Sequence, residues 1–157
     1  MAVSDISPVV ARLKNRIESV ANIGLVADHD LYSRDDLRPV LVSTILGAPT
    51  LRAWWITGPS MDGVNMVQTA AGHIERTWTY TIFGVEGLSA SGDSVLTLRT
   101  NALAVSDAID ADRDLNGTVH RTLPCKWRVA PQNRAGWRGV AVSYVEITKQ
   151  VITLSTP

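Results

Sequence analysis

The longest amphipathic pattern in the chain spans residues 91–112. Apolar residues recur there at spacings of three, four, three and four, at Val95, Leu98, Ala102, Val105 and Ile109. The positions between them are mainly polar or charged, so one side of the segment is apolar and the other is polar. This period predicts an α-helix from Ser91 to about Asp112 that buries one stripe of side chains.

The segment before this helix alternates with a period of two. From Glu75 to Phe83, one set of alternating positions holds Arg76, Trp78, Tyr80 and Ile82, and the other is rich in threonine. β-Branched and aromatic residues with this period predict a β-strand. A strand that leads into a long amphipathic helix needs a second layer, so we expect the rest of the chain to supply more sheet.

The N-terminal part predicts a helix followed by strands. Ser7-Pro8 is typical of a helix start, and Asn22 and Gly24 of a helix end. Leu51–Thr57 predicts a strand in which Trp54 and Trp55 point to opposite faces. If only one face of the sheet is covered, one indole is left near water for a partner; helices on both faces would instead bury both.

The segment Gly58–Gly72 predicts a long connector between two strands. It holds Met61, Met66 and Val67, which are not spaced as a helix face. Long connectors are often functional, and methionine is common on binding surfaces. We expect either a mobile hairpin arm over residues 58–72 that orders against a partner, or an exposed hairpin tip.

The C-terminal part is rich in β-forming residues. Gly117–Pro124 and Lys126–Val129 predict strands, Pro131–Gly136 a loop, and Arg138–Leu154 a long β segment. Runs of strands beside separate helices indicate an α+β fold. We therefore expect one domain over residues 1–157, a mostly antiparallel sheet packed by an N-terminal helix and a long central helix.

Composition narrows the functional classes. The 157 residues are 45% hydrophobic with no formal net charge, which argues against a dedicated duplex-DNA binder. Arginine (12) outnumbers lysine (3), which suits protein interfaces but also follows from a GC-rich genome. The single cysteine, Cys125, excludes an internal disulfide. Neither a membrane span nor a signal peptide is visible, so synthesis in the cytoplasm is expected.

The chemistry-bearing motifs are weak. Asp112-x-Asp114-x-Asn116-Gly117 imitates the start of a calcium loop, but Leu123 stands where a bidentate glutamate is needed. The three histidines have no partners at a recognised ligand spacing. Cys125 is expected to be a buried, inert thiol. No nucleophile elbow, P-loop or dinucleotide-binding motif is present, and we expect no enzyme activity, no cofactor and no metal site.

Three segments resemble a known family. They are Trp78–Leu88, the following Ser89–Leu96, and Asp114–Val119 after the predicted helix. Together with the order of elements, they resemble tail terminator and minor tail proteins of long-tailed bacteriophages (lambda-type terminators), including relatives in gene transfer agents. The resemblance implies an α+β subunit of a ring, commonly a homohexamer, that caps the tail tube, ends its growth and joins the head connector. DNA would pass through the pore without sequence-specific binding, and the protein would reside in the virion tail or neck.

A ring built from head-to-tail contacts needs complementary patches on each subunit. The candidate contacts are Trp54, Trp55, Met61, Met66, Val67, Val151 and Leu154. Two alternatives remain. One is a neighbouring head completion or connector protein of the neck. The other is a small hydrolase or ligand-binding domain, with a site among Asp110, Asp112, Asp114 and His120.

Overall fold

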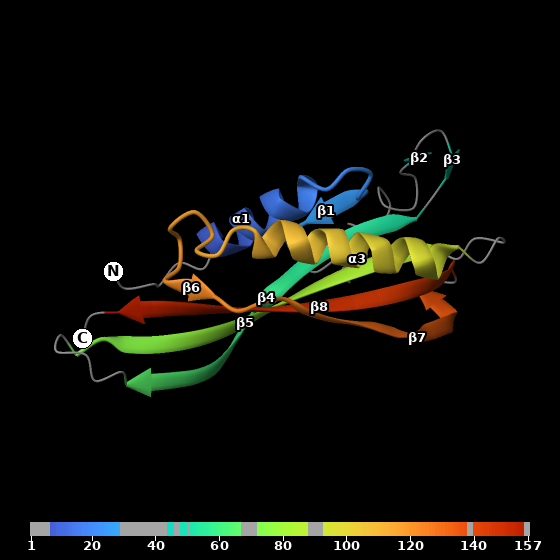
Figure 1. Ribbon diagram of the computed structural model, residues 1–157. Helices are drawn as coiled ribbons and strands as arrows, with labels where there is room; N and C mark the ends of the chain where they lie inside the picture. Colours follow the sequence, from blue (N-terminus) through green and yellow to red (C-terminus); the bar gives the residue numbers. More distant parts are fainter. Residues whose placement is uncertain are drawn as a thin grey trace.

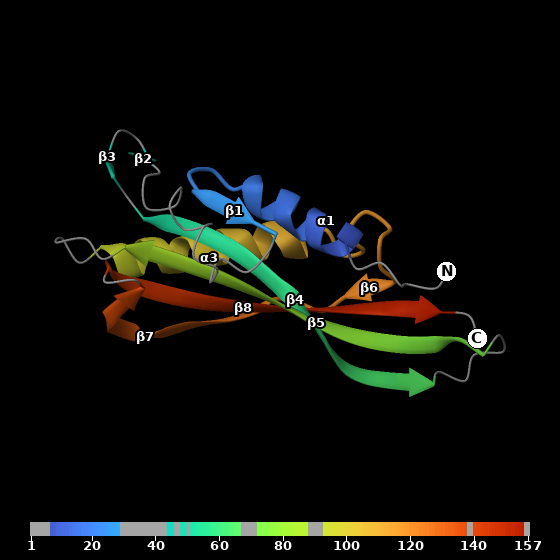
Figure 2. The same cartoon turned by 180° about the vertical axis from the view of Figure 1, so that it is seen from behind.

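The computed structural model describes residues 7–28, 44–45, 48–49, 51–66, 72–87, 93–137 and 140–155. Within them, two helices lie against one face of a six-stranded mixed sheet, as Figures 1 and 2 show from opposite sides. The predicted α+β class and single domain are confirmed. The helices are α1 (Ser7–Glu18) and α3 (Ser94–Asp110).

The sheet is antiparallel except at one edge. The short strand β1 (Leu25–Ala27) runs parallel to β4 (Arg52–Met66), which pairs antiparallel with β5 (Ile74–Gly87). β5 pairs with β8 (Val140–Ser155), and β6 (Arg121–Thr122) and β7 (Lys126–Trp137) both pair with the other side of β8. Strands β2 (Thr44–Ile45) and β3 (Ala48–Pro49) form a separate two-stranded sheet.

The helical periodicity predicts the core correctly. Leu98, Ala102, Val105 and Ile109 of α3 are fully buried, whereas Val95 is only partly buried. They pack with buried residues of α1 and of the covered sheet face, including Leu13, Ile17, Tyr80, Ile82 and Ile147. α3 has 17 residues and is shorter than predicted at its C-terminal end, where Ala111 follows as its cap. The predicted first residue, Ser91, lies outside the described part of the chain.

The two neighbouring tryptophans lie on opposite faces, but both are fully buried. Trp54 belongs to the helix-side core, and Trp55 belongs to a second cluster with Ala53, Val85 and Val142. Trp55 also stacks on the ring of Phe83, with centroids 5.5 Å apart. Of the two alternatives, the one that places an indole near water is wrong, and both indoles are buried because the sheet carries an apolar cluster on each face.

A glycine on the neighbouring strand makes room for Trp54. Gly84 pairs with Trp54 across β4 and β5, and a Cβ atom on Gly84 would lie 2.6 Å from the indole ring. Gly84 and Gly87 both belong to β5. The absent side chain at Gly84 thus serves close packing and not a turn.

The predicted connector is largely a strand. Gly58 to Met66 continue β4, and the pairs Ser60–Thr79, Met61–Trp78 and Met66–Ile74 hold this part against β5. The register shifts twice, between Thr57 and Ser60 and between Met61 and Gly63, as in β-bulges. Gly58–Met66 is therefore strand and not connector, residues 67–71 lie outside the described part of the chain, and ordering of the hairpin upon assembly stays a prediction. Val67 lies outside the described residues.

The C-terminal strands are partly as predicted. β8 covers nearly the whole of the predicted segment, but only Arg121–Thr122 of the predicted strand Gly117–Pro124 is extended. β7 continues to Trp137 through the segment that predicted a loop. Pairing with β8 therefore extends β7 beyond what the local residue preferences indicate.

Candidate interaction surface

The outer side of α3 carries two exposed leucines. Leu96 is 67% exposed and Leu103 is 53% exposed. They are seven residues apart, so they lie on the same side of the helix, away from the buried stripe. The sequence pattern predicts a mainly polar side here and does not indicate the pair. The signal that could have found it is a second apolar spacing of seven residues off the main stripe.

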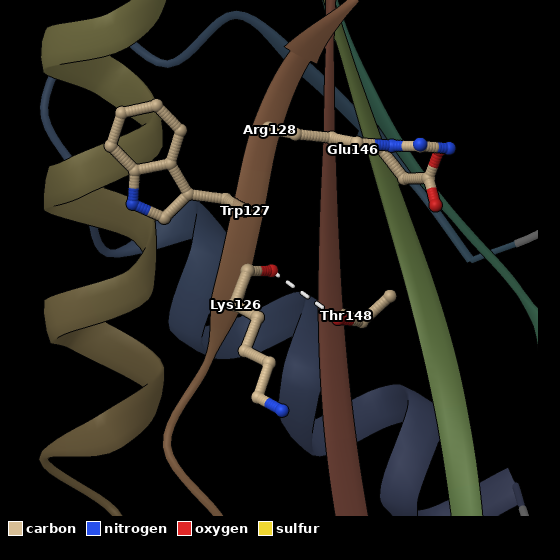
Figure 3. Close-up of a pocket in the computed structure, with 5 residues that line it drawn as sticks. All are labelled: Lys126, Trp127, Arg128, Glu146 and Thr148. Atoms are coloured by element: carbon tan, nitrogen blue, oxygen red, sulfur yellow. Dashed lines mark hydrogen bonds and ion pairs between the residues drawn. The ribbon is translucent and has the colours of Figure 1, made fainter.

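An exposed tryptophan lies on the neighbouring edge strand. Trp127 of β7 pairs with the buried Ile147 of β8, so both side chains are on the face that the helices cover. α3 and β7 are in contact, and in Figure 3 the indole of Trp127 extends toward α3. The indole stays partly exposed, as does Leu123 just before β7. We call Leu96, Leu103, Leu123 and Trp127 the α3–β7 surface.

The opposite face of β7 is polar. Lys126, Arg128, Glu146 and Thr148 lie on this face, and together with the neighbouring Trp127 they line a hollow of about 170 Å³; the five residues are drawn in Figure 3. The guanidinium of Arg128 donates to Glu146 at 2.9 Å, and the hydroxyl of Thr148 donates to the carbonyl oxygen of Lys126 at 3.4 Å. This volume is below that of ordinary small-molecule sites. The hollow is therefore a surface depression beside the Arg128–Glu146 ion pair, and it is too small to enclose an ordinary small-molecule substrate.

The residues that imitate a calcium loop form a link between helices. Asp112 is buried, and its Oδ2 accepts hydrogen bonds from Nε of Arg12 at 3.0 Å and Nε of Arg16 at 2.8 Å. Its Oδ1 accepts the backbone N–H of Asn116 at 2.8 Å, which closes the turn after α3. Asp114, the next carboxylate of the motif, is exposed. Within the described ranges no three His, Cys, Asp or Glu side chains gather as a metal site would require.

The partners of Asp112 decide its charge. Burial alone would raise the pKa of this carboxyl, but hydrogen bonds from Arg16, the Asn116 amide and Arg12 outweigh it, and the pKa is lowered. An ionised Asp112 therefore joins α1 to the end of α3. The acidic turn therefore contributes a buried link between the two helices.

The carboxylates of the alternative hydrolase site face different partners. Asp112 contacts α1, whereas Asp110 pairs with Lys149 of β8, with Nζ 2.6 Å from Oδ1. Asp114 and His120 are exposed. The structure therefore does not bring the four predicted residues together around one reacting atom.

Cys125 lies beside the Asp110–Lys149 pair. Its backbone N–H donates to both carboxylate oxygens of Asp110, at 3.1 and 3.0 Å. Burial, with a further contribution from Asp110, raises the pKa of the Cys125 thiol to about 12. The group is therefore a thiol at neutral pH, as expected of an inert cysteine.

The residues predicted as subunit contacts differ in their exposure. Met61 is strongly exposed on β4, and Leu154 is partly buried on β8. Trp54, Trp55 and Val151 are fully buried within the subunit, so the prediction that they present surface to a partner is wrong. These residues are not on the surface, because the sheet carries a buried apolar cluster on each of its faces. The backbone of Met66 lies in β4, and Val67 lies outside the described residues.

A scan of the sequence against known protein families finds no match, and no curated protein is significantly similar to it. In the part of the chain that the structure describes, neither helix has the length and apolar character needed to cross a membrane.

Proposed function

We propose that the chain is a structural subunit that forms a ring at the end of a bacteriophage tail tube, stops tube growth and offers a joining surface to the head connector. In this role it resides in the virion tail or neck, after assembly in the host cytoplasm. Its partners are further copies of itself, the tube protein and the connector. The ring of copies is expected to be a homohexamer. DNA passes through the pore, and the role needs no catalysis.

The observation that carries this proposal is the position of the exposed apolar side chains. The α3–β7 surface lies along one edge of the sheet, beside β8. Met61 is exposed on β4, toward the other edge. β1 pairs only with Ala53–Trp55, so at Met61 β4 is the outermost described strand. Two unlike patches on opposite edges suit a head-to-tail contact, which closes into a ring when the rotation allows.

The assembly experiment measures mass and shape. We expect size-exclusion chromatography with light scattering to detect a ring, and electron microscopy to find that ring on the end of purified tail tubes. Binding to the head connector but not to tubes would favour a head completion protein instead. A strict monomer at every concentration, which also ignores tubes and connectors, would overturn the proposal.

A charge at either patch tests the contact without entering the core. Leu103→Glu and Met61→Glu should each reduce assembly, because each would bury an unpaired carboxylate at the contact. Asn15→Glu on the exposed side of α1 is the matched control. Far-ultraviolet circular dichroism checks that each variant remains folded. Normal rings from both patch variants would show that the patches are not the contact.

A further inference from the structure

A polar pocket lies at the C-terminal end of α3. Its volume is about 360 Å³, and it is lined by Asp110, Arg113, Thr122, Leu123, Pro124 and Lys149. These residues come from the end of α3, the following turn, β6 and its continuation, and β8. A hydrogen bond from the backbone N–H of Thr122 to the carbonyl oxygen of Arg113, 2.9 Å long, holds two of these walls together.

Lys149 brings a buried cation to this pocket. Its side chain is 1% exposed, and its Nζ donates to Asp110 at 2.6 Å. An ammonium group has three N–H donors, and within the described ranges the carboxylate of Asp110 is its one hydrogen-bond partner. A buried donor without an acceptor is costly, so a further acceptor entering the pocket would be favoured.

Arg113 adds a second cation at the rim. It is exposed, and its guanidinium makes no ion pair with any residue that the structure describes. With Lys149 and Asp110, the pocket holds two positive charges and one negative charge, a net charge of one positive. One singly charged anion would therefore neutralise it.

We propose that this pocket binds the carboxylate of a glutamate or aspartate side chain from a partner protein. Lys149 and Arg113 would donate charge-assisted hydrogen bonds to the carboxylate. Leu123 and Pro124 would pack against the aliphatic stem of that side chain. A nucleic acid fits less well, because its backbone carries a row of negative charges whereas the pocket has a net charge of one positive.

The test uses the full chain and a small probe, so it does not depend on ring formation. The probe is N-acetyl-glutamate N-methylamide, its uncharged control is the glutamine analogue, and inorganic phosphate is a third ligand. Ligand-observed saturation-transfer NMR is recorded on the dilute, unassembled chain, because Leu123 also belongs to the α3–β7 surface that a ring would cover. We expect the glutamate probe to bind and the glutamine analogue to bind at least about fivefold more weakly.

Variants then locate the binding. Arg113→Gln should weaken binding of the glutamate probe by roughly fivefold, because one charge-assisted donor is lost. Arg99→Gln, an exposed arginine on α3 outside the pocket, should change it by less than about twofold. Equal binding of the glutamate and glutamine probes, equal effects of the two variants, or tighter binding of phosphate would each overturn the proposal. A ring that assembles normally while the probe fails to bind would reject this pocket and leave the proposed function intact.

Discussion

Two sets of ion pairs lie at the C-terminal end of α3, one toward α1 (the α1 flank) and one toward β8 (the β8 flank). Both link α3 to a neighbouring element, but their buried members carry opposite charges. On the α1 flank, the side chain of Asp112 is 6% exposed, and its partners Arg12 and Arg16 are 30% and 34% exposed. On the β8 flank, Lys149 is 1% exposed and its partner Asp110 is 34% exposed. Each flank thus buries one charge and keeps the partner in contact with water, but the buried charge is an anion on one side and a cation on the other.

This difference shows which member of each pair is hard to remove. A buried charge that loses its partner stays in a poorly solvated place, and this is strongly destabilising. A partner that already reaches water can be solvated again when the buried member is removed. We therefore expect the more exposed member of each pair to be the costlier one to delete, which is the reverse of the usual rule that burial predicts cost.

The largest effect is expected at Asp110. Asp110→Ala would leave the ammonium of Lys149 buried without its carboxylate and the Cys125 amide without its acceptor, and should lower the free energy of unfolding by about 3 kcal/mol. Lys149→Met keeps the volume and lets Asp110 be solvated, so it should cost about 1 kcal/mol. Urea unfolding followed by fluorescence measures both.

The pair of variants also provides its own control. The double variant Asp110→Ala/Lys149→Met should be more stable than Asp110→Ala alone, since no buried charge remains unpaired. If Lys149→Met costs as much as Asp110→Ala, the asymmetry that we infer for the β8 flank does not exist.

A smaller loss is expected from the arginines of α1. The double variant Arg12→Ala/Arg16→Ala should cost about 2 kcal/mol, because Asp112 stays buried but keeps its hydrogen bond from the Asn116 amide. Lys14→Ala on the same helix is the control. Its ion pairs with Glu18 and Asp28 are 4.0 and 3.9 Å long and exposed, so its effect should stay within about 0.5 kcal/mol. Equal losses in the double variant and the control would show that the link to Asp112 does not stabilise the fold.

Acid should weaken both flanks. Burial raises the pKa values of Asp110 and Asp112, but hydrogen bonds from Lys149 and Arg16 respectively outweigh it, and both lie below the ordinary value of 3.8. A lowered pKa in the folded state stabilises the protein fully above the unfolded pKa, and this stabilisation is lost as pH falls through the folded pKa.

The contribution of each carboxylate to the loss of stability in acid can be measured. Urea unfolding between pH 6 and pH 2.5 should show stability falling below about pH 4, by at most about 1.4 kcal/mol per pH unit for each group. Asp112→Asn removes one titrating group and should make the slope shallower. An unchanged slope would mean that Asp112 does not contribute to the acid sensitivity.

The smallest change in stability is expected at Cys125, where the readout is reactivity. Because burial raises the pKa of this thiol to about 12, alkylation by iodoacetamide at pH 7.5 should be at least about 100-fold slower in the native protein than in urea. Mass spectrometry measures the rate. Rapid native alkylation would show that the β8 flank opens readily near Asp110.

Local patterns predicted much of the fold but little of the surface. The stripe of α3, the alternation of β5 and the β-rich end of the chain all follow from spacing, because apolar faces must be buried whatever covers them. Gly58–Met66 was missed as a strand because its glycines, Pro59 and Asp62 predict a turn. Pairing with β5 overrides that preference in the folded protein.

Which apolar residues are exposed depends on the tertiary structure. Leu103 is exposed because it lies on the side of α3 away from the buried stripe, whereas Trp127 is exposed because β7 lies at the sheet edge. Trp55 is the opposite case, because an apolar cluster on the second face buries it, whereas the sequence left open whether one of the two indoles lies near water.

The sequence by itself therefore determined the fold class, the buried side of α3 and the identity of the main strands, since these depend on the period of nearby residues. Tertiary structure alone decided which charges meet. Arg12 and Asp112 lie 100 positions apart, and Asp110 and Lys149 lie 39 apart. No local pattern encodes such pairs, because they form when separate elements pack and the buried charges need partners within hydrogen-bond distance.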